Sequence, residues 1–393
     1  MTNINIASLH PSNASLSPFV EISLDNLNYN IDQIRRALPS SVGIMAVVKD
    51  NAYGCGSVMV SRCLEERGVA FFAVARVSEA RTLRDGGIVS PILVLGQADA
   101  EGLRWGAGAN IRFSLTDLSD ISLWKICGCP VRFHADIDTG MGRIGLQPGE
   151  TAALIDAVRG DRNLTFEGMY THLANADAED AGPTQRQIAL FRSVRAGLAS
   201  AGLKPAILHY GNSAGLMRFP QEECTLVRPG ISLYGCNPDP TRSFPLLLKP
   251  VMGLKGRVVK VKQVGPGTAV SYGSTYVTSS ETVIATIGIG YGQGVPRFLS
   301  NRGGVLIRGS RFQIAGRVTM DYIMVDAGAT SPLSIGDEVC VMGCQGTQCI
   351  APDEVALLGN TIGYEIMCSV SSTIDRYYLF EGKAVRFEPA RPF

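Results

Sequence analysis

The sequence predicts an α/β protein in which a (β/α)8 TIM barrel is followed by a C-terminal all-β domain. In the first half, about eight strand-and-helix units follow one another within roughly 210 residues, which fits a closed barrel better than an open sheet. No Gly-x-Gly-x-x-Gly pattern follows the first strand, which disfavours a dinucleotide-binding fold. After Pro250 the apolar runs become short and are separated by glycine turns, as in an all-β domain.

The elements can be predicted in order along the chain. Apolar residues at helical spacing before Pro39 predict an amphipathic helix over residues 25–38. The expected barrel strands are VGIMAVVK, FFAVAR, PILVLG, NIRFSL, VRFHADID, LTFEGMYTH, AILHYGN and CTLVRPG. Their continuous apolar character indicates a parallel sheet that is buried on both faces. We expect a disordered leader at 1–18, the barrel at 19–249 and the β domain at 250–393.

Charge and composition exclude several classes of partner. Lys and Arg total 36 against 35 Asp and Glu, so no net field favours nucleic acid or an anionic membrane. No apolar run approaches the roughly 20 residues of a membrane-spanning helix, and the N-terminus lacks the pattern of a secretory signal. We therefore expect a cytoplasmic protein with a small-molecule partner.

The ten cysteines contain no C-x-x-C pair and are expected to be reduced structural thiols. Cys340, Cys344 and Cys349 lie close together in the sequence, which leaves a zinc site open as an alternative. No histidine is nearby and no fourth ligand is evident, so we expect no metal.

Three polar residues follow barrel strands, where barrel enzymes gather their functional groups: Lys49, His172 and Arg228. A lysine at such a strand end can lose hydration, which lowers its pKa and favours covalent bonding to aldehydes. Taken alone, Lys49 fits a solvated lysine at a strand end better. His172 could equally be structural, and Arg228 could belong to an ion pair.

The sequence segments around these residues resemble the signature motifs of alanine racemases. The segment AVVKDNAYG resembles the motif of the pyridoxal-phosphate lysine, and DIDTGMGRIG, HYGNSAG, VRPGISLYG, VSYGSTY, IGYGQGVPR and AGRVTMDYIMVD follow in the family's order. The resemblance covers the chain from about Phe19 onward. It implies a racemase acting on alanine, pyridoxal 5′-phosphate as cofactor and a head-to-tail homodimer.

The resemblance also implies roles for individual residues. Lys49 and Tyr272 of the partner subunit would be the two acid/base catalysts, because racemisation removes a proton from one face of Cα and delivers it to the other. The cofactor would be held by Lys49, Tyr53, His172, Ser213, Arg228, Tyr364 and the backbone of Gly230 and Ile231. The substrate would contact Arg143, Met320 and Asp321, and the entrance would be lined by Tyr291 and Arg297. Ser213 could also be a helix N-cap.

Three positions depart from the family pattern. Asp136 stands where the family often has a carbamylated lysine, and we expect its carboxylate to take over that partnership with Arg143. Cys55 and Gln293 replace a histidine and an aspartate, which leaves a racemase for serine or for a broader range of amino acids open. A non-catalytic pyridoxal-phosphate carrier and a decarboxylase also stay open, although Arg228 disfavours the decarboxylase.

Overall fold

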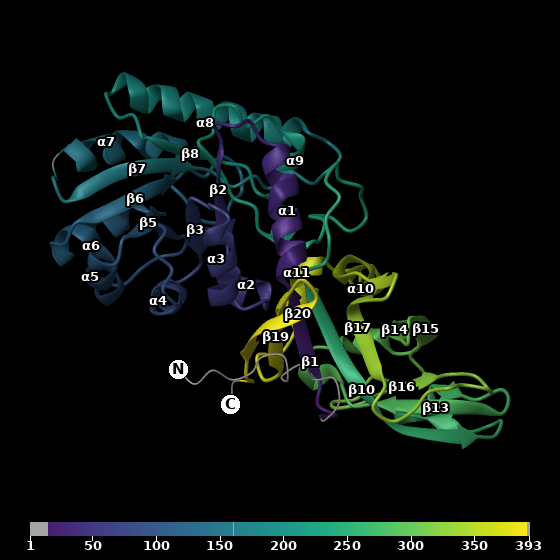
Figure 1. The fold of residues 1–393 in the computed structure, drawn as a ribbon. Helices are drawn as coiled ribbons and strands as arrows, with labels where there is room; N and C mark the ends of the chain where they lie inside the picture. The colour runs from purple at the N-terminus through teal and green to yellow at the C-terminus, as the bar shows by residue number, and fades with distance from the viewer. Residues whose placement is uncertain (1–14, 160, 391–393) are drawn as a thin grey trace.

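The computed structural model describes residues 15–159 and 161–390, and its first half is a barrel of parallel strands (Figure 1). The strands are β2 (Gly43–Val47), β3 (Phe71–Val74), β4 (Ile92–Val94), β5 (Ile111–Leu115), β6 (Val131–Asp136), β7 (Leu164–Tyr170), β8 (Ile207–His209) and β9 (Leu226–Val227). They form one eight-stranded sheet in the order β8-β7-β6-β5-β4-β3-β2-β9. Backbone hydrogen bonds from Thr225 to Leu208 (2.8 Å) and from Arg228 to Gly211 (2.7 Å) join β9 to β8. The predicted barrel is confirmed.

Helices surround the barrel, and α8 is the longest of them (Figure 1). They are α1 (Leu24–Arg36), α2 (Lys49–Tyr53), α3 (Ser57–Glu66), α4 (Val77–Asp85), α5 (Ala100–Gly108), α6 (Leu118–Cys127), α7 (Thr151–Arg159), α8 (Gly182–Ser200) and α9 (Ser213–Arg218). The predicted helix at 25–38 is α1, which buries Leu27, Ile31 and Ile34 on one face. Its N-cap is Ser23, whose side chain accepts from the N–H of Asn26. No helix among the described residues is long and apolar enough to cross a membrane.

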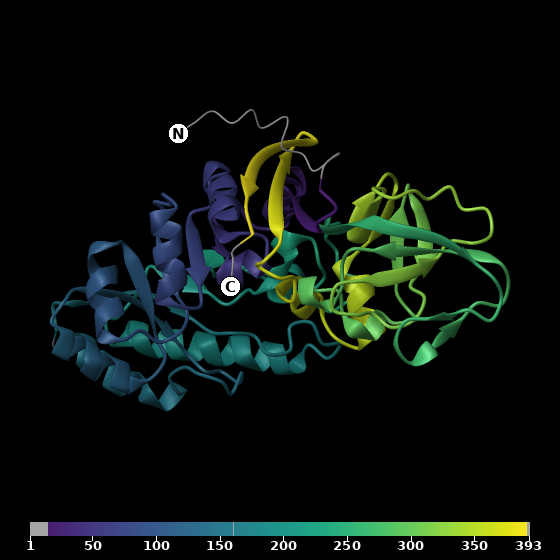
Figure 2. The ribbon, with the colours of Figure 1, turned by 90° about the horizontal axis from the view of Figure 1, so that it is seen from below.

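A ten-stranded sheet forms the core of the second half (Figure 2). Its strands are β1 (Phe19–Ser23), β10 (Met252–Val264), β13 (Thr282–Ile287), β14 (Gly304–Ile307), β15 (Ser310–Gln313), β16 (Ile323–Asp326), β17 (Glu338–Gln345), β18 (Gln348–Ile350), β19 (Asp375–Phe380) and β20 (Lys383–Glu388). A separate hairpin of β11 (Ala269–Val270) and β12 (Tyr276–Val277) and two helices, α10 (Pro352–Gly359) and α11 (Gly363–Cys368), complete it. The predicted C-terminal β architecture is confirmed.

The chain contributes a strand to this sheet before it builds the barrel. Strand β1 pairs antiparallel with β10 and parallel with β19, so residues 19–23 belong by hydrogen bonding to the C-terminal sheet. The expected division at 249/250 stays a prediction. Of the expected leader at 1–18, residues 1–14 lie outside the described residues.

The prediction of reduced thiols is wrong for two cysteines. Cys344 and Cys349 face each other across the β17–β18 hairpin and form a disulfide. This pairing is possible because the two residues are directly opposite in the antiparallel register, which a scan for C-x-x-C spacing does not detect. Cys340, the third of the close trio, is a buried free thiol, and the described residues contain no group that could hold a metal ion.

Candidate active site

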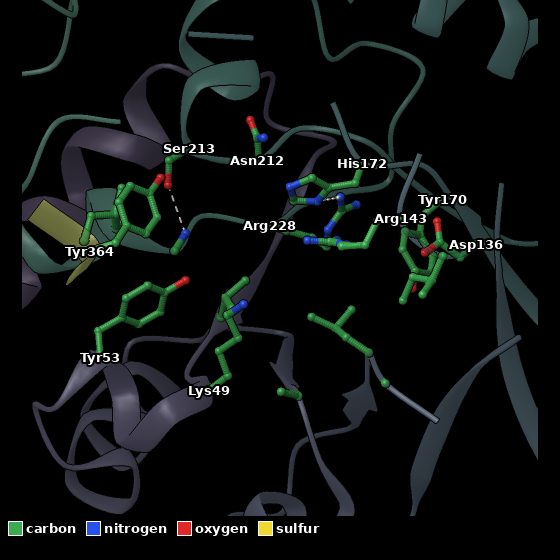
Figure 3. A pocket seen from close by; sticks show the side chains of 17 residues that line it. Lys49, Tyr53, Asp136, Arg143, Tyr170, His172, Asn212, Ser213, Arg228 and Tyr364 are labelled. Atoms are coloured by element: carbon green, nitrogen blue, oxygen red, sulfur yellow. Dashed lines mark hydrogen bonds between the residues drawn. The ribbon is translucent and has the colours of Figure 1, made fainter. Parts of the chain in front are cut away.

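A cavity of about 420 Å³ opens at the carboxyl ends of the barrel strands (Figure 3). Residues that end or directly follow a strand, such as Val47, Ala75, Asp136 and Tyr170, form its floor. The cavity collects nine of the residues singled out from the sequence: Lys49, Tyr53, Arg143, His172, Ser213, Arg228, Gly230, Ile231 and Tyr364. Its volume suits a small organic molecule.

Lys49 enters the cavity because the chain leaves β2 through an unusual turn. The four residues from Asp50 to Tyr53 have φ between 52° and 55°, which is the left-handed region, so α2 is a single left-handed turn. Asn and Asp tolerate this region, whereas Ala52 and Tyr53 each cost roughly 1–2 kcal/mol there. Buried neighbours must therefore hold the turn. Because of this turn, the side chains of its first and last residues, Lys49 and Tyr53, both enter the same cavity (Figure 3).

One side of the cavity is a cluster of hydrogen-bond donors. Burial raises the pKa of both the Tyr53 and the Tyr364 phenol, so both keep their protons and can donate. Ser213 lies beside them and accepts from the backbone N–H of Gly230 at 3.0 Å. A Cβ at Gly230 would lie 2.5 Å from the Tyr53 hydroxyl, so only glycine permits this close approach. Protonated phenols and a hydroxyl form a donor set that suits a phosphate dianion.

The alternative role of Ser213 as an N-cap is wrong. The N-cap of α9 is the preceding residue, Asn212, whose side chain accepts from the N–H of Gly215 at 2.8 Å. Ser213 instead ties α9 to the loop at Gly230 and Ser232 by accepting from both. The hydroxyl therefore faces the donor side of the cavity, next to Tyr364 (Figure 3).

Arg228 lies on the opposite side of the cavity and is buried. Its Nη1 donates to the backbone oxygen of His209 and to His209 Nδ1, and its Nη2 donates to the backbone oxygen of Thr171. His172 Nδ1 lies 3.4 Å from Nη2. Among the described residues these bonds occupy both terminal nitrogens, which leaves Nε–H as the donor available to the cavity. Burial and the charge of Arg228 lower the pKa of His172 to about 3, so its imidazole is neutral.

Arg143 reaches the cavity from a loop organised by one carboxylate. Asp138 Oδ1 accepts from the N–H groups of Gly140 (3.0 Å), Met141 (2.9 Å) and Gly142 (3.1 Å). These bonds close the loop tightly and present the exposed Arg143 at the cavity rim.

Asp136 lies in the cavity floor, but the expected ion pair with Arg143 does not form among the described residues. The Asp136 side chain is buried, and the loss of hydration raises its pKa to about 7. Arg228, Tyr170 and Arg143 lower the pKa but only partly offset the burial. Near neutral pH the group is thus a mixture of acid and carboxylate rather than a fixed anion.

We expect Asp136→Asn to stabilise the cofactor-free protein at pH 8.5 and to have a much smaller effect at pH 4. Because the folded-state pKa is raised from 3.8 to about 7, the folded protein binds more protons than the unfolded chain between these values, so stability falls as the pH rises. The gain at pH 8.5 should be roughly 1–4 kcal/mol in the free energy of unfolding. Urea unfolding at both pH values measures it, and an equal difference at both would contradict the raised pKa.

Five of the predicted site residues lie outside the cavity, on the surface of the β domain. These are Tyr272, Tyr291, Arg297, Met320 and Asp321, and all five are exposed. Tyr272 is 72% exposed, so none of residues 15–159 and 161–390 covers most of it. Backbone hydrogen bonds from Tyr291 to Thr319 and from Gly292 to Met320, each 2.9 Å, hold two of the segments together.

The cavity also contains residues that the sequence did not single out. Tyr170 and Asn212 line it, and the ring of Tyr170 stacks on buried His209 at 4.8 Å. The available signal for Tyr170 was its place at the end of β7, where barrel strands present their functional groups. The two remaining departures do not enter the cavity: Cys55 is fully buried, and the Gln293 side chain accepts from the N–H of Gly290 within its own turn.

Comparison with known proteins identifies the family of the chain. Residues 22–238 match the family model "Alanine racemase, N-terminal domain", and residues 251–378 match "Alanine racemase, C-terminal domain". The alanine racemase of Halothermothrix orenii is 40% identical over 364 residues, which cover 92% of this chain and 96% of that protein. Among solved structures, an alanine racemase of Clostridium difficile 630 superposes with a TM-score of 0.89 at 34% identity, covering 96% of this chain and 100% of that one.

A histidine racemase of Leuconostoc mesenteroides subsp. sake also superposes, with a TM-score of 0.85 at 29% identity, and covers 94% of this chain and 100% of that one. The architecture is thus shared by proteins named for different amino acids. Both family models together nevertheless span most of the sequence, and the chain belongs to the alanine racemase family.

Proposed function

We propose that this protein is a pyridoxal-5′-phosphate-dependent racemase that interconverts L-alanine and D-alanine. The observation that carries the proposal is the cavity itself, in which a strand-end lysine, a set of phosphate-type donors and a buried arginine face one another. Membership of the alanine racemase family supports the same reaction.

The residues present fit the cofactor. Tyr53, Tyr364, Ser213 and the backbone of Gly230 and Ile231 would hold its phosphate, because together they supply hydrogen-bond donors on one side of the cavity. Arg228 would donate through Nε to the ring nitrogen, and neutral His172 would lie along the ring. When bound, pyridoxal phosphate withdraws electrons from the substrate Cα and makes its proton acidic. A guanidinium opposite the ring nitrogen limits that withdrawal, which favours racemisation over other outcomes.

Two groups of this chain would move the proton. The amine of Lys49 would remove it from or return it to one face of Cα, and the phenol of Tyr272 would serve the other face. Arg143 would bind the substrate carboxylate at the rim. Because Tyr272 is exposed on the β domain of its own chain, we propose a head-to-tail homodimer in which Tyr272 of the partner subunit covers the cavity. The same surface of the partner subunit would supply the substrate contacts of Met320 and Asp321 and the entrance residues Tyr291 and Arg297.

The substrate can be tested directly with a panel of L-amino acids. We expect D-alanine to form from L-alanine with the highest kcat/KM, and serine to follow at a lower value, because a pocket without a dedicated partner discriminates a hydroxyl only weakly. Chiral chromatography of each reaction measures the product. If histidine or serine is converted faster than alanine, that amino acid is the preferred substrate instead. If no amino acid is converted, the result favours a non-catalytic pyridoxal-phosphate carrier.

A further inference from the structure

A line of buried polar groups runs from Arg228 through the barrel interior, away from the cavity. Arg228 Nη1 lies 2.7 Å from His209 Nδ1, and His209 Nε2 lies 2.8 Å from His134 Nδ1. His134 Nε2 in turn lies 3.5 Å from Glu167 Oε2. Arg112 closes the line by donating to both oxygens of Glu167, at 2.6 and 2.9 Å. Both histidines are completely buried.

The chemistry of these groups fixes the direction of every bond in the line. A guanidinium can only donate, so His209 Nδ1 must accept and the proton of this ring must be on Nε2. His209 then donates to His134 Nδ1, which places the proton of the second ring on its Nε2 as well. Burial lowers the pKa of both histidines, so each ring carries one proton. The line therefore needs an acceptor at its far end, and the Glu167 carboxylate faces that position.

Glu167 faces the interior because of a bulge in β7. The register between β6 and β7 pairs Phe133 with Phe166 and then His134 with Gly168, so Glu167 is the extra residue. A Cβ at Gly168 would lie 2.7 Å from the His134 ring, so both Glu167 and Gly168 are directed at His134. The His134 Nε2 that faces the carboxylate at 3.5 Å and the two hydrogen bonds from Arg112 outweigh the effect of burial and lower the pKa of Glu167 to about 2, so the residue is an anion.

We propose that Glu167 is a distal positioning residue for Arg228. The Glu167 carboxylate fixes the tautomers of His134 and His209, and these two rings fix the orientation of the Arg228 guanidinium. This inference rests on the proposed function only for the catalytic consequence. The tautomers themselves are a property of the protein without cofactor.

The substitution Glu167→Gln tests the proposal because an amide is nearly isosteric with a carboxylate but has one accepting oxygen instead of two. Arg112 needs that oxygen, so the amide NH2 would face His134 Nε2. His134 would then have to accept there and carry its proton on Nδ1, which reverses the bond to His209 and sets a donor against Arg228. The buried line would hold one unfavourable contact in every arrangement.

The first measurement is the 15N spectrum of the imidazole rings in the cofactor-free protein. With four histidines in the chain, the signals can be assigned by substitution. We expect His134 and His209 to be Nε2–H tautomers in the wild type, and Glu167→Gln to shift or broaden both signals. Glu223→Gln is the matched control, since Glu223 also pairs with an arginine, Arg192, and its side chain is 20% exposed against 21% for Glu167. The control should leave both signals unchanged.

The second measurement is the kinetics of the loaded enzyme. Glu167→Gln should lower kcat by roughly 10- to 100-fold with little change in KM, because Arg228 is misplaced while Arg143 is not. Glu223→Gln should keep the wild-type kcat. Wild-type tautomers in Glu167→Gln, or an Nδ1–H tautomer of His209 in the wild type, would overturn the proposal. If the wild type does not racemise any amino acid, the proposed function is overturned, while the NMR result on the tautomers still stands.

Discussion

Replacing Lys49 with alanine is expected to abolish covalent attachment of pyridoxal 5′-phosphate and to remove racemisation to below detection. Lys49 is the one lysine among the residues that line the cavity, so no second amine can take over the bond to the cofactor aldehyde. The phosphate donors Tyr53, Ser213 and Tyr364 stay in place in this variant, so weak reversible binding should persist. The variant thus separates attachment from binding.

Visible absorption and mass spectrometry measure the effect of Lys49→Ala. The loaded wild type should be yellow, and reduction with borohydride should add the cofactor mass to the peptide that contains Lys49. Lys204→Ala, in an exposed loop before β8, is the matched control and should keep the band. An adduct on another lysine in the wild type would refute the assignment.

The strand-end residues of the site could be predicted from the sequence, because the barrel topology alone decides where they meet. Lys49, His172 and Arg228 follow different strands, and closing the barrel brings their side chains to one cavity. Each of these positions depends only on where a strand ends, and the end of an apolar run in the sequence marks that point. The same argument accounts for Asp136, the last residue of β6.

Features that depend on register and backbone strain could not be predicted in this way. The left-handed turn after Lys49 includes Ala52 and Tyr53, whose types give no sign of a positive φ. The bulge at Glu167 changes which face of β7 looks inward, and only the pairing with β6 reveals it. The disulfide between Cys344 and Cys349 likewise follows from hairpin register. Each is a tertiary property that local sequence leaves undecided.

The exposure of Tyr272 is the strongest structural reason to expect a shared active site. Its short turn has two residues with positive φ beside it, Ser271 at 64° and Gly273 at 71°, and Ser271 donates to the backbone oxygen of Arg317 at 2.7 Å. The turn is thus held in a strained shape while its tyrosine points away from the chain's own core. Strain at an exposed residue is typical of a group held ready for a ligand or a partner.

We expect Tyr272→Phe to lower racemisation of L-alanine by a factor of about 10²–10⁴, the range for a lost general base, while leaving cofactor attachment unchanged. The substitution removes one hydroxyl from a side chain that is 72% exposed in the single chain, so folding should not suffer. Tyr322→Phe is the matched control, since Tyr322 is also exposed, at 49%, and has no proposed catalytic role. Activity assays and the absorption band together separate the two effects.

Mixing the two inactive variants gives the sharper test of the shared site. In a heterodimer of Lys49→Ala and Tyr272→Phe chains, one cavity would combine the intact Lys49 of one chain with the intact Tyr272 of the other, and the second cavity would lack both. Random exchange makes half of all dimers heterodimers, each with one working site, so activity should return to about a quarter of the wild-type value. Native mass spectrometry would verify that heterodimers form. If they form and activity stays at the level of the single variants, Tyr272 serves the cavity of its own chain or none, and the head-to-tail arrangement must be abandoned.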